Sequence, residues 1–453
     1  MPLLIVGIAV VLLLVLMMKF KLNGFISLMI VAILVALWGV ATGNLQADGE
    51  PLGLGDIPGL LEDGLGGQLG GTAIVIGLGA MIGRVMGDAG AAQRIAMAIL
   101  NAFGPKGVQW AMVISSMLIG VTMFYEVAFV IVVPVAFTLA RATKVNLLWV
   151  GLPMSISLST MHSFLPPHPG PTAVAGLYDA SVGLTLAYGL LIAIPAGVLV
   201  AMIWPRLPFV KKMNPSIPEG LVSDKEFTDE ELPSRWASFA VALFPIILIA
   251  GSEIIIMTEP SSEALVSTLK FIGSTPIALL ITLLIAIVVF GPMNGRSLKE
   301  VGASMASAAK AMAMILLVIG AGGAFKEVLT SAGISDYIAE TANGWSLNPL
   351  ILAWLIAVIL RVALGSATVA VSTAAGIAAP LVAVSGVSPE LMVLATACGS
   401  IAFSHVNDPG FWMFKEYFNL SVGQALKVRT SYTTVLAILG IIGVLILSTF
   451  ISA

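Results

Sequence analysis

Cysteine, histidine and charge are all scarce in this chain of 453 residues. It has one cysteine and three histidines, which excludes a disulfide framework within the chain and a cysteine-rich metal site. Charged residues make up 10% of the sequence, whereas a soluble domain carries about 25%. Hydrophobic residues make up 58%, and the mean hydropathy is +1.06. No water-soluble core could hide this much apolar sequence, so the lipid bilayer is expected to be the solvent for much of the surface.

Motifs of enzymes and of nucleic-acid partners are also missing. The sequence has no HExxH zinc motif, no P-loop and no GxSxG nucleophile elbow, so we expect neither an enzyme nor a cofactor. The net charge of -3 is too small to suggest a polyanion partner, and no nucleic acid is expected. Residues 2–18 lack a basic region before them and a small-residue cleavage site after them, so they are interpreted as a retained first helix.

Long apolar segments are what the sequence does contain. A helix that crosses the bilayer needs about 20 mostly apolar residues. Segments of about this length lie at 2–18, 24–42, 72–87, 183–204, 237–258, 275–291, 311–329 and 430–450. Shorter or interrupted apolar segments lie at 108–124, 126–140, 146–162, 348–364, 369–384 and 389–403. The pattern predicts an all-α polytopic membrane protein.

Lysine and arginine indicate which connections are cytoplasmic. Lys19 and Lys21 follow the first span, whereas residues 43–71 contain acidic residues but no lysine or arginine. The first connection is therefore cytoplasmic and the second is outside. When the later spans are counted from these two, most basic residues fall on the cytoplasmic side, including Arg429 and those of a loop over 206–236. The basic residues left on the outer half are Lys270, Lys326 and Arg361. Both chain termini are therefore expected to be periplasmic.

Two pairs of short apolar arms begin and end on one side of the membrane, so each pair must be a hairpin. The inner hairpin covers 108–141, with its tip near Tyr125 and Glu126. The outer hairpin covers 348–385, with its tip at Gly365–Thr368. Each arm has about 15 residues, which is short for a full crossing, so we expect re-entrant hairpins. The small residues of the outer tip either approach the substrate or form a helix-packing motif.

The two halves of the chain resemble each other. Gly77-Leu78-Gly79-Ala80 matches Gly320-Ala321-Gly322-Gly323, and Ala89-Gly90 matches Ala332-Gly333 at the same offset. The charge count gives the two copies opposite orientations. Inverted repeats are a recurring plan of secondary transporters, so we predict two inverted structural repeats.

The candidate substrate site lies where two membrane segments are interrupted. SFLPPHPGPT (163–172) and SHVNDPG (404–410) contain prolines that must break a helix. The alternative to a site is a surface loop, but irregular backbone at membrane depth is tolerated only in a cavity or buried in protein. A broken helix also presents a free N-terminus suited to a carboxylate. The substrate-binding candidates are Tyr125, Ser163, Pro167, His168, Gly170, Thr172, Gly365, Ser366, Thr368, Ser404, His405, Asn407 and Asp408.

Ionisable residues at membrane depth are candidates for coupling transport to protons. Glu126 is a candidate proton carrier, unless the hairpin tip simply reaches water. Asp408 is a second candidate, or a group that binds substrate hydroxyls. His168 and His405 titrate near neutral pH when unperturbed, or serve as structural hydrogen-bonding groups. Arg361 either pairs with the substrate carboxylate or extends to the outer surface.

Five long motifs resemble signatures of the gluconate permease family. They are FLPPHPGPTA (164–173), LGSATVA (364–370), FSHVNDPGFWMFKEYFNLS (403–421), GAMIGRVMGDAGAAQRIA (79–96) and FYEVAFV (124–130). The resemblance covers nearly the whole chain. It implies a bacterial inner-membrane symporter that couples H⁺ to the uptake of gluconate or a similar small hydroxy acid. Some members of the family take idonate, fructuronate, D-serine or 3-hydroxybutyrate.

This family is usually grouped with the ion-transporter superfamily, which implies a scaffold, a mobile transport domain, elevator motion and a homodimer. On this plan the first repeat (1–205) has scaffold helices (1–42), transport elements (72–180, with a broken helix over 146–180) and a span (183–204). A cytoplasmic linker (206–236) follows. The second repeat (237–453) has scaffold helices (237–291), transport elements (311–428, with a broken helix over 389–428) and a span (430–450).

Two other functions remain open from the residues. A Na⁺-coupled carboxylate symporter is one, because serine and threonine at hairpin tips can bind Na⁺ through their oxygens. A passive channel or a membrane-embedded enzyme is the other, and the missing enzyme motifs count against the enzyme.

Overall fold

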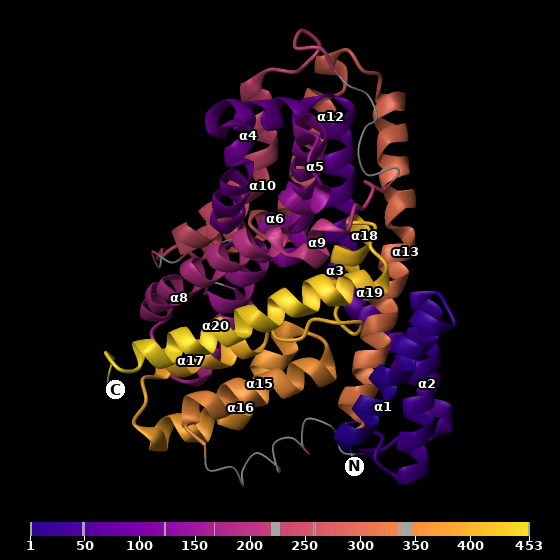
Figure 1. Cartoon of the computed structure of the whole chain (residues 1–453), viewed down its shortest axis with the longest axis vertical. Helices are drawn as coiled ribbons and strands as arrows, with labels where there is room; N and C mark the ends of the chain where they lie inside the picture. Colours follow the sequence, from indigo (N-terminus) through magenta and orange to yellow (C-terminus); the bar gives the residue numbers. More distant parts are fainter. Residues whose placement is uncertain are drawn as a thin grey trace.

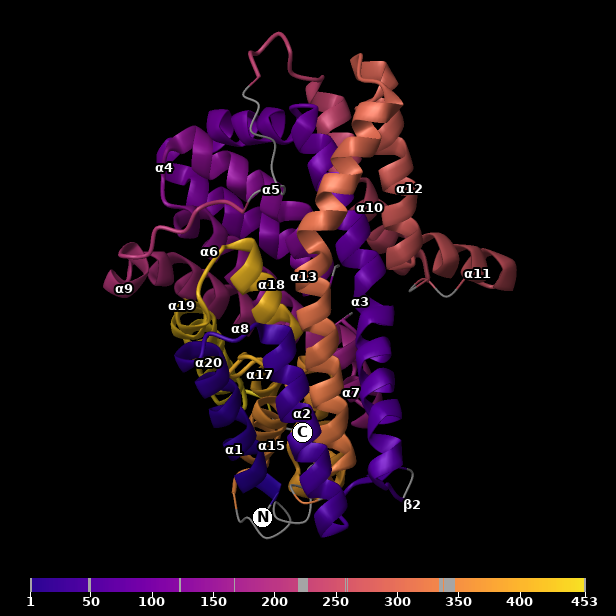
Figure 2. The same cartoon turned by 90° about the vertical axis from the view of Figure 1, so that its right-hand side faces the viewer.

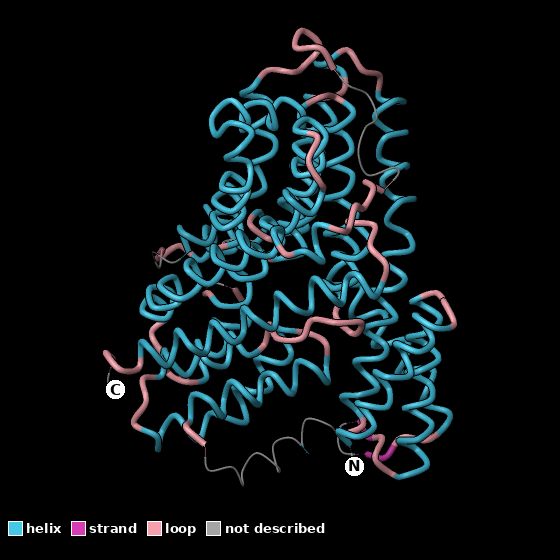
Figure 3. Tube along the Cα trace, in the orientation of Figure 1, coloured by secondary structure: helices cyan, strands magenta, loops and turns pink. Residues whose placement is uncertain are grey.

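The computed structural model describes residues 2–47, 50–121, 124–166, 168–218, 227–256, 258, 260–333, 337 and 347–451. This part of the chain is mostly helical, with loops between the helices and one pair of short antiparallel strands, β1 (Gln46–Ala47) and β2 (Glu50–Pro51) (Figure 3). Eight of its helices are long and apolar enough to cross a membrane. The expectation of an all-α polytopic membrane protein is therefore confirmed.

The helices of the first half are α1 (Pro2–Leu14), α2 (Gly24–Thr42), α3 (Ile57–Asp88), α4 (Ala91–Gly120), α5 (Tyr125–Thr143), α6 (Leu147–Phe164), α7 (Pro169–Leu177) and α8 (Val182–Ile203). Those that follow are α9 (Pro208–Lys211), α10 (Arg235–Ile256), α11 (Glu263–Ile272), α12 (Thr275–Val289), α13 (Leu298–Ser331), α15 (Pro349–Leu364), α16 (Ala367–Ser385), α17 (Pro389–Gly399), α18 (Pro409–Tyr417), α19 (Val422–Ala425) and α20 (Ser431–Leu447). Short 3₁₀ turns lie at Leu54–Asp56, Trp204–Arg206 and Pro292–Asn294, and π-helical turns at Val15–Lys19 and Leu426–Thr430.

The two longest helices, α3 and α13, run side by side along the long axis of the molecule (Figure 2). They are antiparallel. Ser304, near the start of α13, donates a hydrogen bond of 2.6 Å to Asp88 at the end of α3. At the other end, Gly64 of α3 lies against Glu327 of α13. Because a Cβ atom at Gly64 would stand only 2.6 Å from the Cβ of Glu327, glycine allows the two helices to touch here.

Both long helices extend well beyond the apolar segments predicted at 72–87 and 311–329. The added turns contain glycines and charged residues, which lower the hydropathy without ending the helix. The predicted outer loop over 43–71 therefore includes the first turns of α3. Helix α11 was not predicted, because its ten residues are too short and too polar for a span.

The remaining helices pack on either side of this pair. Helix α2 packs against α13, and α12 packs against α3 and α10. Figure 1 shows α1 and α2 beside one end of α13, with α4, α5, α10 and α12 towards the other end. Helices α15, α16, α17 and α20 pack against one another and form a separate layer in the same view.

Helix interruptions follow the same order in both halves. Helices α4 and α5 form a hairpin whose second arm begins at Tyr125, and α15 and α16 form one that turns at Gly365 and Ser366. With 19 residues, α5 is long enough to span a membrane, so the expectation of a short arm is wrong there. In the first half α6 and α7 are separated over 165–168. In the second half α17 and α18 are separated over 400–408.

The described end of the linker between the two halves, residues 227–234, packs against the start of α4. Arg94 at the start of α4 donates hydrogen bonds to the Asp229 carboxylate (2.6 Å) and to the carbonyl oxygen of Pro233 (2.9 Å). Gln93 exchanges two hydrogen bonds with the backbone of Phe227. The linker is thus attached to the turn between α3 and α4.

Candidate substrate site

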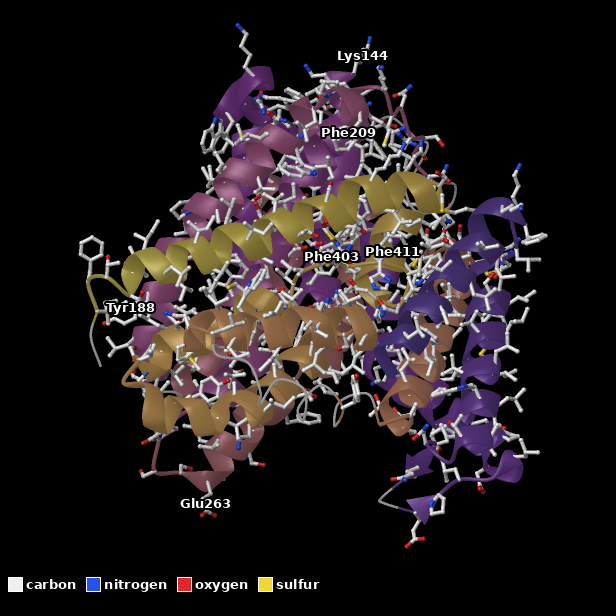
Figure 4. All side chains as sticks on the ribbon, turned by 60° about the horizontal axis from the view of Figure 1, so that its bottom comes forward. Lys144, Tyr188, Phe209, Glu263, Phe403 and Phe411 are labelled. Atoms are coloured by element: carbon white, nitrogen blue, oxygen red, sulfur yellow. The ribbon has the colours of Figure 1, made fainter. Side chains whose placement is uncertain are left out.

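A cavity of about 430 Å³ lies where the helix interruptions meet. Its walls come from α3, α5 and α6 of the first half and from α12, α15, α16, α18 and α20 of the second. Phe403 and Phe411, on either side of the 404–410 motif, lie near the centre of the molecule in Figure 4. Eight predicted site residues line the cavity: Tyr125, Glu126, Ser163, Arg361, Ser366, Thr368, Ser404 and Asp408.

Three helices, α5, α16 and α18, begin at the wall of this cavity. The first N–H groups of a helix have no partner within it and carry a partial positive charge. The start of α18 is already capped, because Asp408 Oδ1 accepts a hydrogen bond from the Gly410 backbone N–H at 3.0 Å. Ser366 caps α16 by accepting from the Val369 N–H at 3.4 Å, and no side chain caps α5. The start of α5 therefore keeps the most capacity for an anion.

Asp408 holds the interrupted segment of the second half together. Its Oδ2 atom is 2.5 Å from Arg361 Nη2 and also accepts a hydrogen bond from the Ser404 hydroxyl. Arg429 Nη2 lies 3.7 Å from the same oxygen. This carboxylate is therefore shared between two guanidinium groups in a buried site.

Arg361 keeps donor capacity that the protein does not use. The residue is 3% exposed, which rules out the alternative that it extends to the outer surface. Its Nε and Nη1 atoms are buried and have no hydrogen-bond partner in the part of the chain that the structure describes. Because a guanidinium fork matches a carboxylate in two parallel hydrogen bonds, these atoms are suited to an organic acid in the cavity.

Arg429 also lines the cavity, whereas the charge count assigned it only to the cytoplasmic side and not to the site. It is 4% exposed and donates hydrogen bonds to the hydroxyls of Tyr125 (2.7 Å), Tyr432 (2.8 Å) and Ser404 (2.8 Å). Its guanidinium lies 4.6 Å from the centre of the Tyr125 ring, a cation–π contact. Arg429 thus connects the start of α5, the interrupted segment and α20. A count of basic residues near span ends cannot distinguish such a buried arginine from one in a loop.

Glu126 follows Tyr125 in the first turn of α5. Its side chain is partly buried, lines the cavity and forms no ion pair with any residue that the structure describes. The charged side chains at the cavity are then two arginines, Arg361 and Arg429, and two carboxylates, Glu126 and Asp408. Their formal charges cancel when both carboxylates are ionised.

Two residues predicted to bind substrate are placed behind the wall instead. His405 and Asn407 do not line the cavity, and both contact the carbonyl oxygen of Val362, at 3.1 Å from His405 Nε2 and 2.8 Å from Asn407 Nδ2. They therefore pair with a carbonyl oxygen in the last turn of α15. For His405 this agrees with the alternative that it is a structural hydrogen-bonding group.

Gly365 is required by backbone packing. It has a left-handed φ of +75°, and a Cβ atom there would stand 2.2 Å from the carbonyl oxygen of Asn407. No residue with a side chain fits this approach of the outer hairpin to the interrupted segment. Gly365 does not line the cavity itself.

The first interrupted segment contributes less to the cavity than predicted. His168 is buried behind the wall and contacts the carbonyl oxygen of Gly120 at 2.7 Å through Nε2. Gly170 lines a much smaller space that adjoins the cavity at Ser163 and Thr368, and Thr172 lines neither. Pro167 lies outside the described residues.

One face of α6 was missed by the sequence analysis. Ser159 and His162 line the cavity together with Ser163, at the spacing that places side chains on one face of a helix. Ser155, one turn earlier, contacts the hydroxyl of Tyr125 at 3.0 Å. The signal was present in the sequence as a serine at every fourth position of an apolar helix. Gln68 of α3 and Thr275 of α12 also line the cavity and were missed.

In the part of the chain that the structure describes, no group of three or more His, Cys, Asp or Glu side chains could hold a metal ion.

The whole chain is similar to known membrane permeases. Residues 1–450 match the family described as GntP family permease. The chain is 47% identical to a high-affinity gluconate transporter of Escherichia coli (strain K12), over 99% of both chains. It is 43% identical to the Gnt-II system L-idonate transporter of the same organism, over 98% of both. It is also 43% identical to a gluconate permease of Bacillus licheniformis, over the full length of both.

Proposed function

This chain belongs to the GntP family of permeases, and from that premise we propose that it imports gluconate or a closely related small hydroxy acid by proton symport across the bacterial inner membrane. It is a multi-pass membrane transporter and not an enzyme. The observation that carries the choice of substrate is the buried guanidinium of Arg361, whose Nε and Nη1 atoms have no partner among the described residues. The cavity of about 430 Å³ is within the range of pockets that enclose small molecules.

The cavity wall offers the groups that a sugar acid needs. A carboxylate would accept hydrogen bonds from Arg361 and from the first N–H groups of α5 and α16. Hydroxyl groups would pair with Ser366, Thr368 and Ser404, which line the same cavity. Relatives named for gluconate and for L-idonate support a substrate of this class.

The charges at the cavity support proton coupling. With Glu126 and Asp408 both ionised they balance Arg361 and Arg429, so an incoming organic anion leaves one negative charge uncompensated. Charge interactions are strong in a site of low dielectric, and a proton on Glu126 restores the balance. Asp408 is engaged by Arg361, Ser404 and the Gly410 N–H. Glu126 is therefore the better proton carrier.

Membrane vesicles with an imposed pH gradient test this coupling. We expect gluconate to accumulate only when the gradient drives protons in the direction of uptake. Glu126→Gln should abolish accumulation while exchange of internal for external gluconate persists, because the neutral side chain no longer loads and releases a proton. The control is Glu300→Gln, at an exposed helix start. Accumulation that does not depend on the pH gradient would refute proton coupling. Accumulation that is unchanged in Glu126→Gln would refute the role of Glu126.

A Na⁺-coupled carboxylate symporter is the second candidate, supported by the Ser366 and Thr368 hydroxyls at the start of α16. Uptake that depends on Na⁺ at fixed pH would decide for it. A member of the family specific for another acid, such as idonate, D-serine or 3-hydroxybutyrate, would be revealed by competition of unlabelled acids with labelled gluconate.

The transport mechanism that we propose is alternating access by elevator motion in a homodimer of inverted repeats. The scaffold would be 1–42 and 237–291, and the hairpins and broken helices would move. The antiparallel α3 and α13 and the common order of interruptions support the repeat. The cavity is lined by α12 of this scaffold and by α5, α16 and α18 of the hairpins and broken helices, so such motion would expose it.

A further inference from the structure

The face of α6 that lines the cavity carries hydrogen-bonding atoms that the protein leaves unused. Ser159 Oγ and His162 Nδ1 are buried and have no hydrogen-bond partner among the residues that the structure describes. Ser163, on the same face, also lines the cavity. Leaving a buried polar atom unpaired is costly, and in Ser159 and His162 such an atom belongs to a side chain that lines the cavity, so a group that enters there could pair with it.

The position of His162 is fixed by its neighbours. Its ring lies 4.8 Å from the ring of His168 and 5.8 Å from that of Phe124, measured between ring centres. His168 is itself held by its 2.7 Å contact with the Gly120 carbonyl oxygen. A ring held in this way loses little conformational freedom when it meets a ligand.

The chemistry of this face differs from that of Arg361. Serine hydroxyls and a neutral imidazole both donate and accept hydrogen bonds, as substrate hydroxyl groups do. A carboxylate only accepts, and the charged guanidinium is its stronger partner. We infer that Ser159, His162 and Ser163 form a second subsite for hydroxyl groups along the carbon chain of the substrate, in addition to Ser366, Thr368 and Ser404, with His168 as the residue that positions His162. This inference rests on the proposed function.

Helix α6 also supplies a matched control. Ser157 is buried and its hydroxyl has no partner among the described residues, as for Ser159, but it does not line the cavity. A loss of affinity that follows from removing any buried serine hydroxyl of this helix would therefore appear in both alanine variants.

Calorimetric titration of the purified protein in detergent tests the subsite, with gluconate and a set of monodeoxygluconates as ligands. Ser159→Ala should weaken gluconate binding about 2- to 10-fold, the range expected for one hydrogen bond. Ser157→Ala should stay within about 2-fold of the wild type. For at least one deoxy analogue, the wild type and Ser159→Ala should bind equally, because the analogue lacks the hydroxyl that Ser159 contacts.

The roles of the two histidines are separated by combining variants. His162→Phe keeps a ring of similar shape without hydrogen bonds and should weaken gluconate more than it weakens one of the deoxy analogues. His168→Phe should weaken gluconate as well, but should add little in a protein that already carries His162→Phe, because it acts through that ring.

Two kinds of failure are distinguishable. A wild-type protein that binds no polyhydroxy acid would overturn the proposed function and this inference with it. Gluconate binding that is unchanged in Ser159→Ala, or reduced equally in Ser157→Ala, would overturn the inference and leave the proposed function standing.

Discussion

Arg361 and Asp408 form a buried ion pair in which the two residues have different tasks. Asp408 is surrounded by donors from Arg361, Ser404 and the start of α18. Arg361 uses one nitrogen for this pair, and two others have no partner among the described residues. Removing one partner of a buried pair leaves the other uncompensated, at a cost of about 3–5 kcal/mol. The fold and the binding of an anion can therefore be separated only by a substitution that keeps the charge.

Arg361→Lys is such a substitution. Lysine can still pair with Asp408, but it is a point charge without a planar fork. We expect the midpoint of thermal unfolding to fall by a few degrees at most, while gluconate affinity falls by about 100-fold, or roughly 3 kcal/mol. Both quantities can be measured on the same purified protein.

Arg361→Met provides the contrasting case, because it removes the guanidinium at 2.5 Å from the Asp408 carboxylate and leaves only Arg429, at 3.7 Å, to balance the charge. This variant should unfold at a much lower temperature. If Arg361→Lys binds gluconate as the wild type does, the spare nitrogens of Arg361 are not the carboxylate site.

For single residues, the presence of an ionisable side chain at membrane depth was enough to predict Glu126, Arg361 and Asp408 as candidate site residues from the sequence. It did not reveal Arg429, because basic residues at the start of a span are usually in a loop. His168 and His405 were predicted instead of His162 because they lie in the two interrupted segments. The helical periodicity of α6, and not the motif, determines which histidine reaches the cavity.

The close crossing of α3 and α13 is the main feature at the scale of elements. Gly323 of α13 faces Gln68 of α3, and a Cβ atom there would stand 2.3 Å from the Cβ of Gln68 and 2.4 Å from the carbonyl oxygen of Gly64. Because Gln68 also lines the cavity, this helix contact forms part of the site.

Gly323→Ala should separate the two helices. We expect a loss of about 1–3 kcal/mol in stability from overpacking, together with weaker gluconate binding because Gln68 moves. Gly302→Ala, on the same helix with nothing within 4 Å of its Cβ position, should be neutral or stabilising by up to about 1 kcal/mol. Thermal unfolding in detergent compares the two. Equal effects would mean that the contact is not tight.

The interruption over 165–168 lies in a proline-rich motif, because proline removes a donor and cannot continue a helix. The interruption over 400–408 ends at Pro409, which is the first residue of α18. The ends of α3 and α13 were not predictable from hydropathy. Their outer turns are polar and glycine-rich, and they are helical through contact with each other. Long-range packing of this kind leaves no local signal in the sequence.

The proposed orientation belongs to the scale of the whole molecule. Lys144 and Glu263 are both exposed, and they lie at opposite ends of the view in Figure 4. The charge count expects Lys144 to be cytoplasmic and Glu263 to be periplasmic. The single cysteine, Cys398, is buried, so introduced cysteines can be labelled against a low background.

Labelling of spheroplasts with a membrane-impermeant maleimide tests this orientation. We expect the Glu263→Cys variant to react in intact spheroplasts and the Lys144→Cys variant to react only after the membrane is opened. The unsubstituted chain, with Cys398 alone, gives the background. The reverse pattern would show that the chain is inserted the other way round.

The distribution of charge between the two halves has a consequence for biogenesis. Arg361, Asp408 and Arg429 all belong to the second half, and Glu126 is the acidic residue that the first half brings to the cavity. The first half leaves the ribosome first, and Glu126 is the charged cavity residue that it carries into the lipid. The second half brings each cation together with a nearby counter-ion. Substitutions among these three residues should therefore lower the amount of protein that reaches the membrane, whereas those on α6 should leave the yield intact.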